Sequence, residues 1–315
     1  MAPWPPCGPP SEEISAEPVL AAMPGLSDPT PPAPPIGYPA PLAASETHPE
    51  IKRAATGAAL ALTTYDVGES AQTIAKRIPA TAKEAVAEAA QALHRPYSWS
   101  RGRIVYPQFG GLQPDRASVM VVVERMQGSP EGLCSESRTL DIRMSLEEGE
   151  WRFDRLASDG GQPVKRPASL SPEATAVLDN PRIELPDTAR WDIHEGRVSD
   201  TLLGLMARAA QQVSFGVIVF DTGHPWEVFG TDRQSDHSRG LAVDLYRIGD
   251  NLIIDDRETG SKTHSFVTWL YEQGDVRQIG SPWALDGRGG RSFSDALHQD
   301  HIHIGVHRHL PAGLQ

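Results

Sequence analysis

Polar and apolar side chains alternate most clearly near the C-terminus, in residues 299–306. Successive side chains of a strand point to opposite faces, so His301 and His303 are expected on one face. The other face then carries Ile302 and Ile304. Two imidazoles on one face and a row of branched aliphatic side chains on the other predict a strand whose aliphatic face packs on the core. Its imidazole face is then expected to bind a metal.

The same reasoning predicts the other elements of the C-terminal region. Leu202 and Leu205 belong to a series of apolar residues at helical spacing, and Ser199 is expected to cap their helix over 201–213. The continuous apolar run 215–220 predicts an inner strand. The remaining expected elements are a short helix at 172–178, a strand at 252–254, a helix at 263–273 ended by Gly274, and a strand at 276–279.

The preceding region has a different pattern. Residues 51–95 are Ala-rich with helical spacing, the run Val119–Val123 predicts a buried strand, and residues 147–150 predict a hairpin turn. Helices followed by an antiparallel sheet resemble the nuclear-transport-factor-2-like cone fold, over roughly residues 55–157. The resemblance implies an accessory domain, and this region contains no catalytic constellation.

Composition divides the chain into four parts. Residues 1–50 are rich in Pro, Ala, Ser and Glu, which predicts a disordered arm. An accessory α+β domain is expected over 51–157, and Gly, Pro and Ser mark a linker over 158–172. A second domain then occupies 173–315, so α+β is the expected fold class of the chain.

Charge and length exclude some partners. The chain has 315 residues and a formal net charge of −12, which argues against a nucleic-acid partner. No apolar run is long enough for a transmembrane segment. Cys7 and Cys134 are the two cysteines, and a disulfide between them is not expected. The start at Met1 lacks the basic residues and apolar run of a signal peptide.

Three side chains form a candidate metal site. Catalytic zinc is held by His and carboxylate ligands, with one position left for water. His237, Asp244 and His303 offer such a set. Gly240 lets the chain turn sharply or approach closely between the first two ligands. Ala242 shares a strand face with Asp244 and leaves room for the ion, which is expected to be Zn2+.

These stretches resemble the LAS metallopeptidases, a group with lysostaphin-type enzymes, D-Ala-D-Ala carboxypeptidases and the hedgehog fold. The first motif of the D-Ala-D-Ala branch is matched by Ser235, His237, Gly240, Ala242 and Asp244, and the second by residues 300–303. The resemblance covers roughly residues 175–310. It implies a hedgehog-like or D-Ala-D-Ala-peptidase-like antiparallel sheet with helices, zinc on the three ligands, and a catalytic group just before the last ligand.

Two residues remain candidates for that catalytic group. Asp300 lies where this branch often carries an acidic general base, whereas His301 shares a strand face with His303. Either could take a proton from the attacking water. His298 is a further candidate, with a supporting or surface position as the alternative. Two more histidines beyond the strand are expected to face solvent, His307 and His309.

One departure from the family concerns substrate binding. Members of the D-Ala-D-Ala branch usually carry Ser-Gly-Tyr-Arg before the first motif, and that Arg helps to hold the substrate. Residues 222–225 here are Thr-Gly-His-Pro. Arg233 could instead grip a carboxylate or polarise the scissile carbonyl, with Arg239 as second choice and a surface salt bridge as the alternative for either. Ser235 is expected to support the ligands through hydrogen bonds.

Together these features predict a zinc-dependent peptidase acting on peptidoglycan peptides, at a D-Ala, as a carboxypeptidase or an endopeptidase. Such a substrate requires an extracytoplasmic or cell-wall location, although no leader is visible. The alternative is a zinc-bearing module that binds peptidoglycan or a protein without turnover. The scissile bond and the oligomeric state stay open.

Overall fold

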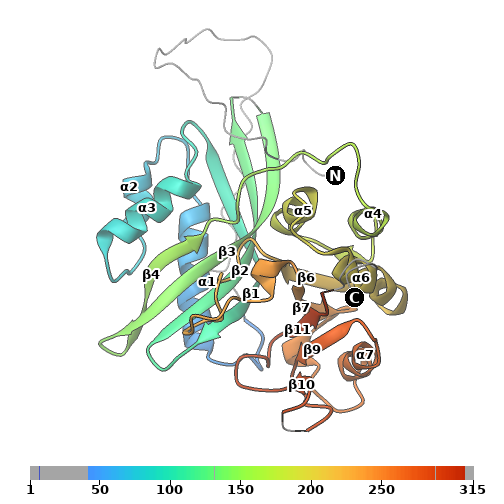
Figure 1. Ribbon diagram of the computed structural model, residues 1–315. Coiled ribbons are helices and arrows are strands. Elements are labelled where there is room, and N and C mark those ends of the chain that lie inside the picture. The colour runs from blue at the N-terminus through green and yellow to red at the C-terminus, as the bar shows by residue number, and fades with distance from the viewer. Residues whose placement is uncertain (1–6, 8–41, 131, 288, 309–315) are drawn as a thin grey trace.

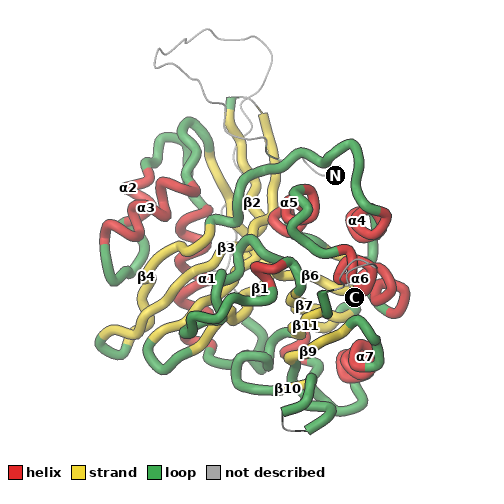
Figure 2. Tube along the Cα trace, viewed as in Figure 1, coloured by secondary structure: helices red, strands yellow, loops and turns green. Residues whose placement is uncertain are grey.

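The computed structural model describes Cys7 and residues 42–130, 132–287 and 289–308. The strands form two sheets in the middle of the molecule, and helices lie on both outer sides (Figure 1, Figure 2). Helices and open, mainly antiparallel sheets occur together, so the expected α+β class is confirmed. Among the described residues, no helix combines the length and apolar character needed to cross a membrane.

The N-terminal half is an antiparallel sheet of order β1-β2-β3-β4 with helices on one face. Its elements are α1 (Pro49–Thr63), α2 (Ala71–Ala75), α3 (Lys83–Leu93), β1 (Trp99–Leu112), β2 (Arg116–Ser129), β3 (Gly132–Glu147) and β4 (Glu150–Ser158). The side chain of Ser70 accepts a hydrogen bond from the Thr73 N–H and caps α2. Glu147 pairs with Glu150, so the predicted hairpin turn is confirmed.

In the C-terminal half the strands follow the order β10-β9-β11-β7-β6-β5, and β8 pairs with β7. The helices are α4 (Pro172–Leu178), α5 (Asp187–His194), α6 (Asp200–Gln212), α7 (Lys262–Tyr271) and the 3-10 turns η1 (His237–Arg239) and η2 (Ile253–Asp255). The strands are β5 (Ile183–Glu184), β6 (Phe215–Val219), β7 (Ala242–Ile248), β8 (Asn251–Leu252), β9 (Val276–Gly280), β10 (Ser292–Phe293) and β11 (Ile302–Val306). Ser199 caps α6, as predicted, by accepting from the Leu202 N–H.

One predicted strand is largely wrong. Of the expected strand at 252–254, only Leu252 belongs to a strand, β8, and the chain then enters η2. The N–H of Asp256 donates to the carbonyl of Ile253 at 3.1 Å, which closes a turn. A short apolar run does not by itself distinguish a strand from a buried helical turn.

Side-chain alternation along β2 divides the N-terminal sheet between two cores. Val121 packs with the helices of the N-terminal half, while its neighbour Val122 packs against the C-terminal sheet. There the ring of Tyr106 stacks on that of Tyr246, with centroids 5.3 Å apart. The molecule is therefore layered as helices, sheet, sheet and helices (Figure 1). Because Asp244 and Tyr246 share one face of β7, this candidate ligand points toward the N-terminal sheet.

Part of the arm predicted over residues 1–50 belongs to the fold. Glu46 is 9% exposed and accepts hydrogen bonds from Lys52 and Tyr106. Ser45 Oγ donates to the carbonyl of Ile254 at 3.2 Å and so connects this segment to the C-terminal half. Disorder is thus the wrong prediction for residues 42–50, and residues 1–6 and 8–41 lie outside the described part.

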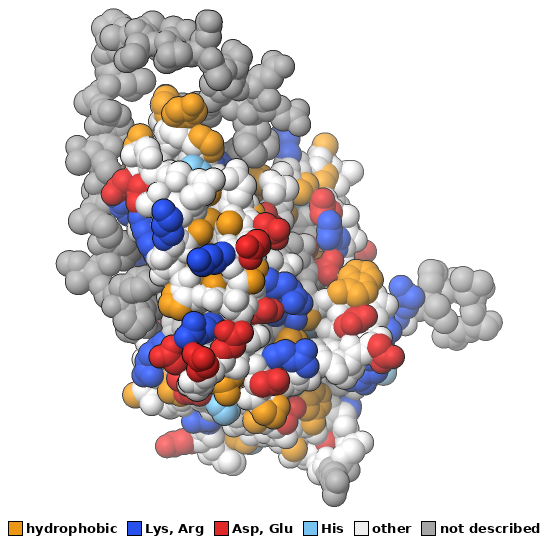
Figure 3. Space-filling view, turned by 90° about the vertical axis from the view of Figure 1, so that its left-hand side faces the viewer, with side chains coloured by type: hydrophobic (Ala, Val, Ile, Leu, Met, Phe, Trp, Pro, Cys, Tyr) orange, Lys and Arg blue, Asp and Glu red, His pale blue; other side chains and the backbone are white. Residues whose placement is uncertain are grey.

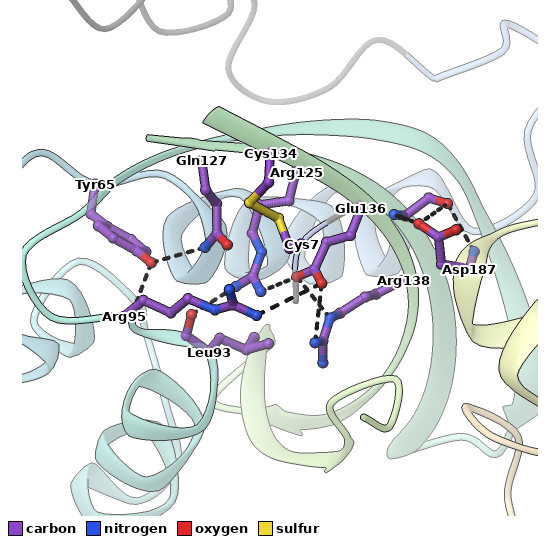
Figure 4. The surroundings of a disulfide bond; sticks show 11 residues. Cys7, Tyr65, Leu93, Arg95, Arg125, Gln127, Cys134, Glu136, Arg138 and Asp187 are labelled. Atoms are coloured by element: carbon purple, nitrogen blue, oxygen red, sulfur yellow. Dashed lines mark hydrogen bonds and ion pairs between the residues drawn. A yellow bond between two sulfur atoms is a disulfide. The ribbon is translucent and has the colours of Figure 1, made fainter. Parts of the chain in front are cut away.

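The expectation of no disulfide is also wrong. Cys7 and Cys134 are bonded although they lie 127 positions apart in the sequence. The N–H of Cys7 donates to the carbonyl of Ser135 at 3.3 Å, so Cys7 lies alongside β3. Figure 4 shows the bond beside the charged side chains of Arg125 and Glu136. Distance along the chain does not predict distance in space, and this pairing depends on where β3 lies.

Charges of both signs are mixed on one face of the molecule. The face in Figure 3 shows acidic and basic side chains next to one another, with hydrophobic side chains scattered among them. Where described residues are visible on that face, no extended basic area is present. The absence of a nucleic-acid partner stays a prediction from the net charge.

Candidate metal centre

The first candidate ligand lies in a tight turn before β7. His237 begins η1, and its carbonyl accepts a hydrogen bond from the Gly240 N–H at 2.8 Å. Gly240 has a φ of 68°, in the left-handed region that favours glycine. A Cβ at this position would lie 1.9 Å from the carbonyl oxygen of Arg197. Both expected roles of Gly240, a sharp turn and a close approach, are therefore present.

The other two candidate ligands lie opposite each other on neighbouring strands. Asp244 of β7 pairs with His303 of β11 in antiparallel register. Ala242 pairs with Gly305 in the same ladder, so small residues lie next to the ligands on this face. On the opposite face Ile304 is buried in the C-terminal core. The backbone ladder and the core together fix the directions of both ligand side chains.

Three ligand atoms meet in a nearly equilateral triangle. Nε2 of His237 lies 3.2 Å from Oδ1 of Asp244 and 3.1 Å from Nδ1 of His303, and the last two atoms are 3.0 Å apart. Ligand atoms of a tetrahedral zinc site, each about 2.0–2.2 Å from the ion, lie about 3.3–3.6 Å apart. An outward shift of a few tenths of an ångström would give these atoms that spacing, and bond-angle changes of a few degrees allow such a shift.

The hydrogen bonding of His237 agrees with a cation in this triangle. Its Nδ1–H donates to the carbonyl of Phe220 at 2.5 Å, so in a neutral ring Nε2 would carry a lone pair. That lone pair faces the Asp244 carboxylate, and the two repel unless a proton or a metal ion lies between them. Burial alone would raise the pKa of Asp244, but the charges of His237 and His301 outweigh it and hold that pKa well below its usual range.

Neighbouring polar groups support the ligands. Nε2 of His303 lies 3.1 Å from Nε2 of Gln278, and this amide nitrogen also donates to Oδ2 of Asp236 at 3.3 Å. Burial lowers the pKa of His303 to about 4, so its ring is neutral near pH 7. The N–H of His237 donates to Ser235 Oγ at 3.3 Å, in line with the supporting role predicted for that serine.

One supporting group comes from the N-terminal half. Gln108 of β1 donates from Nε2 to Oδ2 of Asp244 at 2.6 Å, and both side chains are buried. The two residues are 136 positions apart, and Gln108 stands in an ordinary strand pattern. Nothing in the sequence singles out Gln108.

His224 belongs to the same cluster, although the sequence did not single it out as a ligand. Its ring stacks on that of His237 with centroids 3.9 Å apart, and its Nδ1–H donates to the carbonyl of Pro225 at 2.7 Å. His224, His237 and Asp244 each place one ligand atom within 4.8 Å of the others, so this group could hold a metal ion. Its only sequence signal is its place in a loop directly after an inner strand.

The loop that carries His224 is fixed by Asp192 of α5. Oδ2 of Asp192 accepts the N–H groups of Asp221 and Thr222 at 3.1 and 3.0 Å, and Oδ1 accepts the Thr222 hydroxyl at 2.5 Å. Burial raises the pKa of Asp192 despite these bonds. His224 therefore lies in a loop whose preceding residues are fixed by hydrogen bonds to Asp192.

Asp300 and His301 form a buried pair beside the triangle. Oδ1 of Asp300 accepts from Nδ1 of His301 at 2.6 Å. Oδ2 of Asp300 accepts from Nζ of Lys52 at 2.5 Å and from the N–H of Phe109 at 3.3 Å. Both Asp300 oxygens are thus occupied by protein groups, whereas none of the described residues forms a hydrogen bond with Nε2 of His301. Between the two candidates for the proton acceptor, this arrangement favours His301, with Asp300 orienting its ring.

The same contacts shift the pKa values of this pair. Burial would raise the pKa of Asp300, but Lys52 and His301 outweigh it and lower that pKa to about 2. Burial would lower the pKa of His301, but the carboxylates of Asp244 and Asp300 raise it above its usual value. Asp300 is therefore ionised at neutral pH.

The remaining candidates take different positions. Arg233 is exposed, and within the described residues no hydrogen bond or ion pair joins its guanidinium to the cluster. Arg239 lies 3.6 Å from Asp236 in a half-exposed ion pair, which is the alternative expected for it. His298 is near the centre, its ring 4.9 Å from that of His301. His307 is exposed, as expected, and His309 lies outside the described residues.

Comparisons with known proteins add little to this description. No family model matches the chain, and no curated protein matches it. Among solved structures, the chain is similar to a variant of Rv3472, a protein of unknown function from Mycobacterium tuberculosis. The two share 16% identity over 50% of this chain and 78% of the other, with a TM-score of 0.21. A score this low does not define a common fold.

Proposed function

We propose that this protein is a zinc-dependent peptidase that hydrolyses peptide bonds of peptidoglycan, next to a D-Ala residue. The observation that carries the proposal is the triangle of ligand atoms from His237, Asp244 and His303, with sides of 3.0–3.2 Å. Two imidazoles and a carboxylate are ligands that zinc prefers, and three protein ligands leave a fourth position for the reaction.

The chain's own groups account for the proton transfers. A bound zinc ion would polarise the scissile carbonyl and lower the pKa of the attacking water. As water adds to the carbonyl carbon, Nε2 of His301 accepts its proton. When the C–N bond breaks, His301 returns that proton to the leaving amine. Asp300 holds Nδ1–H of His301 throughout, so the ring keeps one orientation and tautomer.

The substrate class depends on the resemblance to the D-Ala-D-Ala branch of the LAS group. The hedgehog-like form of the C-terminal sheet, and the match of residues 235–244 and 300–303 to the two motifs of that branch, are part of the same proposal. Trp226 is 63% exposed, and its carbonyl accepts hydrogen bonds from Ser235 and Ser238, so it lies at the rim of the centre where a substrate could contact it. The Cys7–Cys134 disulfide supports an oxidising location outside the cytoplasm, where peptidoglycan is found.

A second function is supported by one specific observation. His224 brings a further imidazole to the cluster, and four protein ligands would close the coordination of a zinc ion. Closed sites are structural, so the protein would then bind peptidoglycan or another protein without turnover. This alternative and the peptidase predict different results for the same two measurements.

The test combines metal analysis with mass spectrometry of muropeptides, with and without a chelator. The peptidase proposal expects stoichiometric zinc and a chelator-sensitive loss of mass from the muropeptides. His303→Ala is expected to lose both, and His307→Ala, at an exposed position on the same segment, neither. Full zinc and full cleavage in His303→Ala would overturn the ligand assignment.

His224→Ala separates the two functions. If the ion uses three ligands, this variant keeps its zinc and the unaltered protein cleaves muropeptides. If His224 is a fourth ligand, the unaltered protein binds zinc but leaves the muropeptides unchanged, and the variant binds zinc more weakly. Zinc with no cleavage under any condition favours the binding module.

A further inference from the structure

We propose that the N-terminal half is a working part of the metal centre, with Gln108 as a positioning residue for the ligand Asp244. This inference rests on the proposed zinc site. It differs from the expectation of an accessory domain without chemistry. Two independent contacts across the sheet-to-sheet interface support it.

The first contact acts on a metal ligand. Gln108 donates to Oδ2 of Asp244 at 2.6 Å, while Oδ1 of the same carboxylate faces His237 and His303. One oxygen is thus held by the N-terminal sheet, and the other is left for the ion. Such hydrogen bonds fix the orientation of a ligating carboxylate, and their loss typically weakens metal binding about 10–100-fold.

The second contact acts on the Asp300–His301 pair. Lys52 of α1 and the N–H of Phe109, the residue next to Gln108 in β1, both donate to Oδ2 of Asp300. Lys52 is 0% exposed, so its charge is compensated by protein groups alone. Adjacent residues of one strand therefore reach two different carboxylates of the C-terminal half.

The interface explains why these contacts are stable. Tyr106 and Gln108 lie two apart on β1 and therefore on one face, and Tyr106 stacks on Tyr246, two residues from Asp244 on β7. An apolar cluster between the sheets surrounds this stack. Gln108 is consequently held at a fixed depth beside Asp244. The C-terminal half alone would leave Oδ2 of Asp244 and Oδ2 of Asp300 without these donors.

The experiment measures zinc affinity in the full chain by competition with a chromophoric chelator. Gln108→Leu keeps the side chain's size and removes its donor. Gln127→Leu is the matched control, because Gln127 is buried in the same sheet and its amide makes one side-chain bond, to Tyr65. The zinc dissociation constant is expected to rise about 10–100-fold in Gln108→Leu. In Gln127→Leu it should stay within about twofold, as changes remote from the ligands leave affinity alone.

Several results would overturn the inference. Zinc affinity in Gln108→Leu equal to that of the unaltered protein would do so, as would equal weakening in both variants. If the unaltered protein binds no zinc, the proposed function and this inference both fail. If it binds zinc and Gln108→Leu binds it equally well, only the inference fails. If circular dichroism shows that Gln108→Leu is unfolded, Gln108→Asn replaces it, because its shorter amide retracts from Asp244. Unchanged affinity in that folded variant also contradicts the inference.

Discussion

Lys52 and Asp300 form an ion pair that is fully buried, with Nζ 2.5 Å from Oδ2, although 248 positions separate them in the sequence. Lys52 also pairs with Glu46, so one ammonium group serves two carboxylates. Burial raises the pKa of Glu46 in spite of Lys52, whereas the pKa of Asp300 falls to about 2. The pair connects α1 to the segment that precedes β11, and thereby the two halves of the chain.

Lys52→Met is expected to destabilise the protein by about 3–5 kcal/mol, because it leaves a buried carboxylate without its cation. Chemical denaturation at pH 7 measures the change in the free energy of unfolding. Lys76→Met, at an exposed position in the same half, is the control and should change it by less than about 0.5 kcal/mol. Equal effects of the two substitutions would show that the ion pair does not stabilise the interface.

Gly240→Ala should be strongly destabilising and should weaken zinc binding. The substitution adds left-handed strain of about 1–2 kcal/mol, and its Cβ meets the Arg197 carbonyl oxygen at 1.9 Å. Gly260→Ala separates these effects, because Gly260 has a φ of 88° and a Cβ added there would meet no atom within 4 Å. Thermal unfolding of both variants measures the difference. A similar loss in both would mean that the close approach to Arg197 has no cost.

Glu136 should make stability depend on pH in the acid range. Burial would raise its pKa, but Arg125 and Arg138 outweigh it and lower the pKa to about 2, from 4.5 in the unfolded chain. A lowered folded-state pKa stabilises above pH 4.5, and that contribution, about 3 kcal/mol, is lost as the pH falls toward 2.

Comparison with Glu136→Gln tests this contribution. The difference in unfolding free energy between the two proteins should be largest at pH 6 and should shrink by about 2 kcal/mol at pH 3. A difference independent of pH between 6 and 3 would contradict the assignment. Measuring the difference cancels the contributions of other carboxyl groups.

Reduction of the Cys7–Cys134 bond should lower stability by up to about 5 kcal/mol, because the bond closes a long loop in the unfolded chain. Its partners lie 127 positions apart. Thermal unfolding with and without a reductant measures the loss. The double variant Cys7→Ser, Cys134→Ser should unfold at the temperature of the reduced protein and should not respond to the reductant. An unchanged midpoint for the unaltered protein would exclude a stabilising role.

The sequence predicted the parts of this structure that depend on neighbouring residues. The cap at Ser199 and the hairpin turn at 147–150 follow from local hydrogen bonding, and both are present. The strand that carries His303 follows from alternation. A helical turn at 253–255 was mistaken for strand because a short buried run has no clear period.

Contacts between distant segments could not be predicted in this way. Gln108 and Lys52 stand in unremarkable strand and helix patterns, and their partners Asp244 and Asp300 become visible only when the two sheets are stacked. The disulfide was missed for the same reason. His224 had a weak signal, its place in a loop, which does not distinguish a ligand from a surface histidine.

The pairing of Asp244 with His303 across β7 and β11 has a consequence for selection of the ion. A slip of one position along β11 would turn the His303 imidazole into the apolar core and an isoleucine toward the ligands. A slip along β7 would bury the Asp244 carboxylate in the same way. The two strands therefore cannot shift along each other to change the spacing of the ligand atoms. A larger ion would have to distort the backbone hydrogen bonds between β7 and β11. Rigidity of this kind favours small cations with short bonds over calcium, whose oxygen ligands lie farther out.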